Sequence, residues 1–298
     1  MAPFVSPDVL VLAGGGVVGE AWMTGVLAGI EDGAGVEMAG VEAFVGTSAG
    51  AIVSARLAAG KRLRRPPDPA DTRDAGEVRH DGPVRTVARW GWAATAPLAP
   101  VATAIAAPGG ALARAALLAR VPSGGRSHAR LQSEVAGWGV RFDGRLRICC
   151  VDKRSGRRVV FGAPGAPRAS VAEAVAASCA IPWAFAPVRI DGREYVDGGV
   201  WSVTNLDAAP ARRGAEVLCL DPTASLRTPL RHAFRVGIEV EVQILRRRGA
   251  RVRRVGPDAA AAEAMGTDFM ASAPAPAALA AGYRQGRALT QTPLVSSG

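Results

Sequence analysis

Aromatic residues and histidines are scarce in this chain of 298 residues. Aromatic residues make up 5% of it, and three histidines are present. A core with so few rings must consist mainly of Ala, Val, Leu and Ile side chains. The chain is 49% hydrophobic and 21% charged, which is typical of a globular protein with a sizeable core. Its length suits one large α/β domain or two small ones, at roughly 100–200 residues per domain.

Cysteine is scarce too. The four cysteines are Cys149, Cys150, Cys179 and Cys219. None has the paired spacing of a zinc site, so we expect buried free thiols in a reducing compartment and no bound metal. The N-terminus lacks both the basic and the apolar region of a signal peptide, which predicts a cytoplasmic protein.

Acidic residues are fewer than basic ones. The chain has 36 Lys and Arg against 26 Asp and Glu, a formal net charge of +10. Much of the excess lies in two basic runs, 61–65 and 246–254. Such runs suit an anionic membrane surface, or they form an ordinary solvated surface. No aromatic residues alternate with them in the way that nucleic-acid-binding motifs require, so we expect no nucleic-acid partner.

One long stretch has no charge at all. It runs from Trp90 to Leu112 and has the length of a transmembrane helix. However, Pro97, Pro100 and Pro108 interrupt it, and alanine dominates it, so membrane insertion would be weak. We interpret it as a segment that covers the site or touches a membrane surface; the alternative is a loosely packed Ala-rich helix pair.

The first 60 residues alternate between strand and helix patterns, which is typical of a doubly wound parallel sheet. We expect strands at 9–13 and 41–45 and helices at 19–30 and 49–59. Residues 61 to about 127 break this rhythm and are interpreted as an insertion. Regular structure then returns, with strands expected at 145–151, 158–161, 195–196, 216–220 and 251–255, and helices at 170–178, 232–248 and 275–290.

The most informative motif is Gly46-Thr47-Ser48-Ala49-Gly50. It has the G-x-S-x-G form of a nucleophile elbow, in which a serine lies on a sharp turn between a strand and a helix. The expected strand before it and helix after it fit that geometry. The two glycines suit a turn that is too tight for bulkier neighbours. Ser48 is therefore the candidate nucleophile.

A glycine-rich loop precedes this motif, at Gly14-Gly15-Gly16-Val17-Val18-Gly19. It lies between a strand and a helix, where free backbone N–H groups bind anions. The anion is either the oxyanion of an acyl-transfer intermediate or the pyrophosphate of a dinucleotide, since the loop also satisfies G-x-G-x-x-G. The second alternative needs an acidic residue about 20 positions later, for which Glu37 is the candidate. A purely structural turn is the third alternative.

Ser48 needs a base. The histidines, His80, His128 and His232, do not follow any evident core strand, so a Ser-His-Asp triad is poorly supported. The alternative is the aspartate of Tyr195-Val196-Asp197-Gly198-Gly199. A carboxylate with a pKa of about 3.9 is a weak base at neutral pH, but desolvation would raise that pKa. An ordinary Asp-Gly turn explains the same residues.

Together, the glycine loop, G-x-S-x-G and Asp-Gly-Gly resemble the patatin-like phospholipase family. The segment from Ala176 to Pro187 is similar to the one that precedes the family's aspartate. The resemblance spans about residues 8–290, without the insertion. It implies a three-layer α/β/α fold with a mostly parallel central sheet. The expected organisation is one domain, 1–298, with a core at about 8–60 and 130–290 and an insertion or covering segment at about 61–127.

The resemblance implies a serine hydrolase with a Ser-Asp dyad and no cofactor. Ser48 matches the nucleophile, Asp197 the base, and Gly14, Gly15 and Gly16 the oxyanion hole. The turns are supported by Gly46, Gly50, Gly198 and Gly199. The expected substrates are fatty-acyl esters of phospholipids, lysophospholipids or simpler lipids, cleaved through an acyl-enzyme. Peripheral contact with an anionic membrane is expected, and the oligomeric state stays open.

Val18 departs from the family pattern. Two residues after the third glycine of the loop, the family usually carries Arg or Lys. The departure leaves the backbone donors intact but puts headgroup preference and activity in doubt. Besides the hydrolase and the nucleotide-binding oxidoreductase, a catalytically idle relative that binds lipid therefore remains an alternative.

Overall fold

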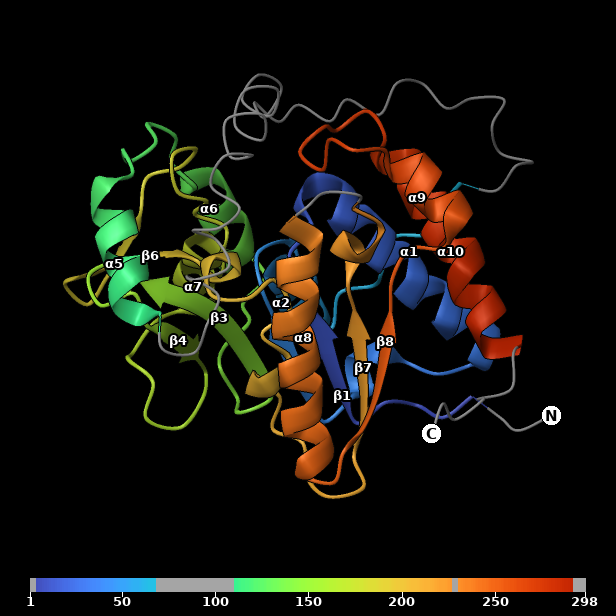
Figure 1. The fold of residues 1–298 in the computed structure, drawn as a ribbon. Helices are drawn as coiled ribbons and strands as arrows, with labels where there is room; N and C mark the ends of the chain where they lie inside the picture. Colours follow the sequence, from blue (N-terminus) through green and yellow to red (C-terminus); the bar gives the residue numbers. More distant parts are fainter. Residues whose placement is uncertain (1–3, 68–109, 227–229, 292–298) are drawn as a thin grey trace.

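The computed structural model describes residues 4–67, 110–226 and 230–291, without the side chains of 230–234. This part of the chain forms one eight-stranded sheet with helices on both faces (Figure 1). The strands are β1 (Val9–Leu12), β2 (Ala43–Gly46), β3 (Leu146–Asp152), β4 (Arg158–Phe161), β5 (Val188–Ile190), β6 (Arg193–Asp197), β7 (Glu216–Leu220) and β8 (Arg251–Val255). The α-helices are α1 (Gly16–Ala34), α2 (Ala49–Ala58), α5 (Ala111–Arg120), α6 (Ala129–Ala136), α7 (Val171–Ser178), α8 (Leu230–Arg247), α9 (Ala259–Met265) and α10 (Ala275–Gln291).

Parallel pairing dominates the sheet. Hydrogen bonds connect the strands in the order β5-β6-β3-β2-β1-β7-β8, and β4 pairs with β3. The strands from β3 to β8 in this order are parallel, whereas β4, β5 and β6 form antiparallel pairs. Every residue of β1 and β2 is buried, as expected for short apolar strands covered on both faces.

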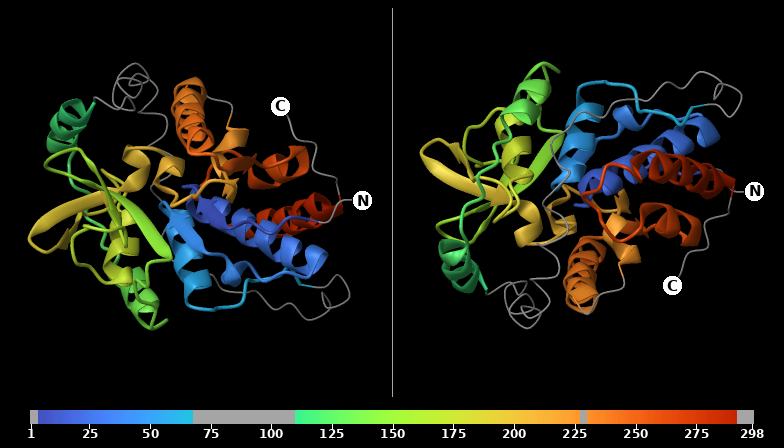
Figure 2. Two further views of the ribbon diagram at one scale, coloured as in Figure 1. Left: turned by 90° about the horizontal axis from the view of Figure 1, so that it is seen from below. Right: turned by 90° about the horizontal axis from the view of Figure 1, so that it is seen from above.

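The sheet separates two layers of helices. On one face, Leu10, Phe44 and Ile148 belong to a large core cluster with residues of α1, α2, α7, α9 and α10. On the other face, Val11 and its neighbours pack against α8, and α5 packs beside it on β3 and β6. Figure 2 shows α8 on the opposite side of the sheet from α1 and α10. The predicted three-layer α/β/α fold with a mostly parallel sheet is confirmed.

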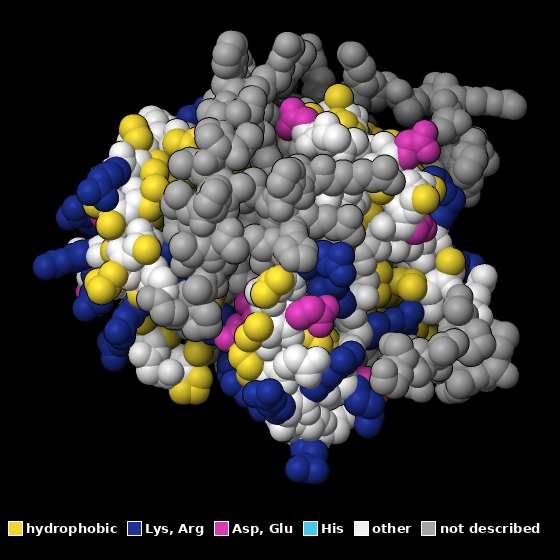
Figure 3. All heavy atoms as spheres, in the orientation of Figure 1, with side chains coloured by type: hydrophobic (Ala, Val, Ile, Leu, Met, Phe, Trp, Pro, Cys, Tyr) yellow, Lys and Arg dark blue, Asp and Glu magenta, His cyan; other side chains and the backbone are white. Residues whose placement is uncertain are grey.

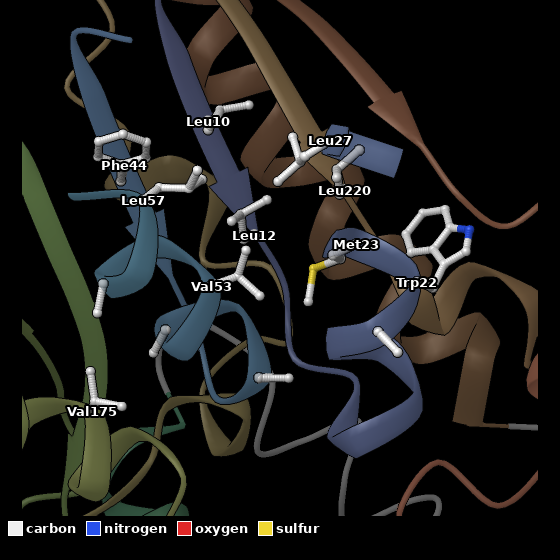
Figure 4. Packing of buried hydrophobic residues seen from close by; sticks show 14 of the residues in the cluster. Leu10, Leu12, Trp22, Met23, Leu27, Phe44, Val53, Leu57, Val175 and Leu220 are labelled. Carbon is white, nitrogen blue, oxygen red and sulfur yellow. The ribbon is translucent and has the colours of Figure 1, made fainter. Parts of the chain in front are cut away.

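Small residues let the helices approach closely. At Gly25 and Gly29 of α1, an added Cβ would lie 2.2 Å from a carbonyl oxygen of α10. Gly282 and Gly286 of α10 face the backbone of α1 in the same way, at 2.4 and 2.2 Å. This contact explains how a chain poor in aromatic residues builds its core. Larger side chains of the cluster fill the space between α1 and the strands, where Leu27 lies near Leu10 and Leu220 (Figure 4).

One feature of the topology brings distant segments together. Strand β4 pairs with one edge of β3 along Ile148 to Val151. Both β2 and β6 therefore lie on the other edge, with Gly46 opposite Ile148 and Asp197 opposite Cys150. Because β2 is parallel to β3 and β6 is antiparallel, the C-terminal ends of β2 and β6 meet head to head. The elbow after β2 and the aspartate at the end of β6 thus become neighbours.

The structure contains all the strands and helices that the sequence predicts, with ends that differ by up to four residues, and adds β5, α5, α6 and α9. Helix α5 lies within the predicted insertion, yet its Leu118 is buried against Val151 and Val196. Residues 68–109 of that insertion, including most of the uncharged stretch, lie outside the described residues. None of the helices in the described ranges has the length and apolar character needed to cross a membrane.

Candidate active site

Ser48 lies at the start of α2 in a strained backbone conformation, with φ 53° and ψ −120°. Few residues other than glycine adopt a positive φ, and those that do cluster at functional sites. A serine at this position usually caps its helix through Oγ, but Ser48 forms no such bond. Its backbone N–H instead donates to Ser178 Oγ at 2.9 Å. The hydroxyl is thus left for other partners.

Both glycines of the elbow lie where no side chain fits. A Cβ on Gly50 would lie 1.9 Å from the carbonyl oxygen of Leu12, so α2 contacts β1 through backbone atoms. A Cβ on Gly46 would lie 2.5 Å from Ala51 Cα. The G-x-S-x-G spacing therefore has a steric cause: the helix turns back directly over the strand that precedes it.

Asp197 ends β6 as a buried residue, 5% exposed. Its Oδ1 accepts the N–H of Gly199 at 2.7 Å, and its own N–H donates to the Ala180 carbonyl at 3.0 Å. Burial raises the pKa of Asp197 to about 6, although hydrogen bonds from Gly199 and the Ser48 side chain oppose the rise. The Ser48 side chain lies close enough to the Asp197 carboxylate to affect its pKa, and the carboxylate is a stronger base than an exposed one.

The turn after Asp197 is equally close-packed. A Cβ on Gly198 would lie 2.2 Å from the carbonyl oxygen of Cys149 on β3. One on Gly199 would lie 3.0 Å from Asp197 Oδ1, so the glycine leaves room for the carboxylate. The Asp-Gly-Gly sequence therefore fixes the carboxylate against the sheet, beside the elbow.

The glycine loop faces the serine. A Cβ on Gly14 would lie 3.6 Å from Ser48 Cβ. The N–H of Gly14 donates to the Val203 carbonyl at 2.8 Å, which ties the loop to the segment after Asp197. Within the described ranges, no acceptor is found for the N–H groups of Gly15, the N-cap residue of α1, and Gly16, its first residue. The free donors of the predicted oxyanion hole are thus at Gly15 and Gly16.

Two positions that the sequence left open now have a place. Val18 is fully buried in the main core cluster, so a cation here would lie among apolar side chains. Glu37 follows α1, whose 19 residues span about 28 Å. It therefore lies at the far end of the helix from the glycine loop, before β2 begins. The suggestion that Glu37 binds a ribose at that loop is wrong for this reason.

No histidine is seen to serve Ser48. His80 and the side chain of His232 lie outside the described residues. The Nε2 atom of His128 lies 2.7 Å from the Cys179 carbonyl, to which it donates, and the ring stacks on Phe185. Burial lowers the pKa of His128. All four cysteines are buried and free, as predicted, and the described residues contain no cluster of three or more His, Cys, Asp or Glu side chains that could hold a metal ion.

Sequence patterns did not reveal two polar residues beside Ser48 and Asp197. Ser178 accepts the Ser48 N–H and donates to the Cys149 carbonyl at 2.7 Å. Asn205, fully buried, donates to Thr47 Oγ1 at 3.0 Å and to the Gly198 carbonyl at 3.3 Å. A signal existed for Ser178, because it is a hydroxyl at the end of a helix that is apolar apart from Glu173. None singled out Asn205.

The sequence profile of the patatin-like phospholipase family matches residues 10–210. This chain belongs to the patatin-like phospholipase family. The matched range contains the glycine loop, the elbow and Asp197. Membership of the patatin-like family favours the hydrolase prediction over the nucleotide-binding oxidoreductase, in agreement with the position of Glu37.

Solved structures resemble the chain more distantly. The crystal structure of the type III effector protein ExoU has 17% identity and a TM-score of 0.42, with 97% of this chain and 54% of ExoU covered. VipD from Legionella pneumophila has 14% identity and a TM-score of 0.44, with 97% and 67% covered. The chain thus spans about half the length of ExoU. The comparison with curated proteins found no match.

Proposed function

We propose that this protein is a serine acyl-ester hydrolase in which Ser48 and Asp197 form a catalytic dyad. The observation that carries the proposal is the position of the two residues at the meeting ends of β2 and β6. Burial raises the pKa of Asp197 to about 6, which brings a carboxylate closer to the pKa that a general base needs at neutral pH.

The reaction follows from these positions. Asp197 takes the hydroxyl proton of Ser48 as Oγ attacks the acyl carbonyl carbon. The negative charge then develops on the carbonyl oxygen, which the N–H groups of Gly15 and Gly16 stabilise. One such donor is typically worth about 10²–10³ in rate. The protonated Asp197 donates its proton to the departing alcohol as the ester bond breaks, which leaves an acyl-enzyme.

Hydrolysis of the acyl-enzyme reverses these roles. Asp197, ionised again, accepts a proton from water as the water oxygen attacks the acyl carbonyl carbon. The tetrahedral intermediate collapses, Ser48 Oγ leaves, and the proton returns to it from Asp197. One buried carboxylate thus serves both halves of the cycle. The N-terminus of α2, directly after Ser48, favours negative charge at Oγ throughout.

The proposed substrates are fatty-acyl esters of phospholipids, lysophospholipids or simpler lipids, the class that the family name indicates. We propose a single catalytic domain, with α5 attached to the core by Leu118. A cytoplasmic location with peripheral contact to anionic membranes also stays a proposal.

The arrangement of charge bears on that contact. Helix α8 ends in Arg246 and Arg247, just before β8 begins. These arginines therefore lie near the N-terminal ends of the parallel strands, whereas Ser48 lies at their C-terminal ends. Figure 3 shows Lys and Arg side chains around this end of α8. Trp183, by contrast, is 48% exposed and lies three residues after Ala180, the partner of Asp197. An interfacial tryptophan on that side supports contact through the site.

Hydrolysis assays with matched variants test the proposal. Nitrophenyl acyl esters and phospholipid vesicles are offered to the wild type, Ser48→Ala, Asp197→Asn and the control Ser54→Ala. Ser54 is buried on the same helix, and its Oγ has no described hydrogen-bond partner. We expect turnover by the wild type and Ser54→Ala only. Vesicle binding without turnover by the wild type would instead favour the idle lipid-binding relative.

A further inference from the structure

We infer that Asn205 is a positioning residue that sets the alignment of Ser48 with Asp197 by joining the two turns that carry them. The inference rests on the proposed function. Thr47 precedes Ser48 directly, and Gly198 follows Asp197 directly. The Asn205 side chain binds both, through Thr47 Oγ1 and the Gly198 carbonyl. It thus forms a bridge one residue away from each member of the dyad.

The chemistry of the neighbours fixes the orientation of the amide. The Gly198 and Ser202 carbonyls can only accept hydrogen bonds, so the nitrogen of Asn205 must face them. The bond to Ser202 is 2.5 Å long. On the other side, Arg158 can only donate, and its Nη1 lies 3.3 Å from Asn205 Oδ1. Both ends of the amide are therefore satisfied in one orientation alone.

The backbone and the surroundings hold Asn205 in place. Its φ of 48° and ψ of 37° are left-handed, a conformation that asparagine adopts more readily than most residues. Arg158 in turn forms a bidentate ion pair with Asp207, with a second contact of 2.8 Å. The buried Glu241 of α8 accepts the N–H of Leu206 at 2.8 Å. A rigid support thus extends from α8 to the dyad.

This arrangement explains why the bridge matters for catalysis. The elbow and the Asp-Gly-Gly turn come from strands that meet end to end on β3, so no direct strand pairing fixes their separation. A displacement of about 1 Å between reacting groups can cost about 100-fold in rate. The Asn205 amide supplies the missing cross-connection.

Four variants test the inference. Asn205→Gly removes the amide but tolerates the left-handed backbone. Thr47→Val removes the acceptor at nearly constant shape, whereas Thr47→Ser keeps it. Gln285→Ala serves as the control, because Gln285 is a buried amide that binds Trp22 Nε1 at 2.9 Å on the α1–α10 side of the molecule. The rate of nitrophenyl ester hydrolysis is divided by the number of sites that a fluorophosphonate titrates.

We expect kcat per titrated site to fall about 10- to 100-fold in Asn205→Gly and Thr47→Val, with a smaller change in KM and a displaced pH–rate profile. Thr47→Ser, which keeps the hydroxyl, should have a kcat close to that of the wild type. The double variant Thr47→Val, Asn205→Gly should have a kcat no lower than that of the less active single variant. The control Gln285→Ala should lower the unfolding free energy but leave kcat per titrated site unchanged. A wild-type kcat and pH profile in Asn205→Gly would overturn the inference.

A failure of the proposed function looks different. In that case, the wild type is neither titrated nor active. The bridge is then judged from chemical unfolding of the same variants, which needs no activity. If the effects of Thr47→Val and Asn205→Gly on the unfolding free energy are coupled, the conclusion that Asn205 joins the two turns stands. Additive effects would refute that conclusion.

Discussion

Replacing Asp197 by Asn is expected to abolish hydrolysis and, at the same time, to stabilise the fold at neutral and alkaline pH. The wild type keeps a carboxylate at a buried position, where burial raises its pKa from 3.8 to about 6. Ionised Asp197 is therefore unfavourable for folding, although the proposed reaction requires it. An amide has nearly the same shape, can still accept the Gly199 N–H through its oxygen and carries no charge.

The magnitude follows from the pKa. A pKa of about 6 in place of 3.8 corresponds to about 3 kcal/mol, because a tenfold change in an acid constant is worth about 1.36 kcal/mol. Because the folded-state pKa lies above the unfolded one, the stabilisation is complete below pH 3.8 and is lost as the pH rises through about 6. About half of the difference, about 1–2 kcal/mol, develops between pH 5 and pH 8. Asn at this position has no such pH dependence.

Urea unfolding of the wild type and Asp197→Asn at pH 5, 6.5 and 8 provides the assay. Glu241, whose pKa burial raises to about 7, is present in both proteins, so its contribution cancels in the difference. We expect the advantage of Asp197→Asn to grow by about 1–2 kcal/mol from pH 5 to pH 8, while wild-type hydrolysis rises over the same range. A difference that does not change with pH would refute the reasoning.

Three further variants probe the rest of the site. Gly50→Ala is expected to lose about 3 kcal/mol of unfolding free energy, at the upper end of the usual cost of overpacking, since its Cβ would overlap the Leu12 carbonyl; Gly40→Ala, with open space around it, should unfold like the wild type in the same urea titration. Ser178→Ala leaves the Ser48 N–H without its acceptor, at a cost of about 1–3 kcal/mol, and should slow fluorophosphonate labelling; unchanged labelling would contradict its role. Val18→Lys places an amine in the core and should lower the melting temperature, less so at high pH where the amine is neutral; a stability independent of pH would contradict the buried position.

Local patterns sufficed to predict the elements that position Ser48. The apolar run of β1, the glycine loop and the elbow are contiguous in sequence, and each element forms by short-range rules. The same applies to the turn at Asp197. The fold class followed from the alternation of strands and helices at the start of the chain.

The joining of these pieces could not be predicted in the same way. Ser178 and Ser48 are 130 residues apart, and Asn205 and Thr47 are 158 apart. Their hydrogen bonds depend on β2 and β6 sharing one edge of β3, which no periodicity encodes. Helix α5 was missed because its apolar residues are mostly alanine, which gives no clear periodic pattern. Its Leu118 finds partners only once β3 and β6 are paired.

The central claim, that Ser48 is a nucleophile activated by Asp197, is tested most directly by fluorophosphonate labelling followed by peptide mass mapping. The account predicts one adduct, on the peptide that carries Ser48, at a rate that rises as the pH passes through about 6. In Asp197→Asn that rise should disappear. An adduct on another residue, or a folded wild-type protein that stays unlabelled, would contradict the account.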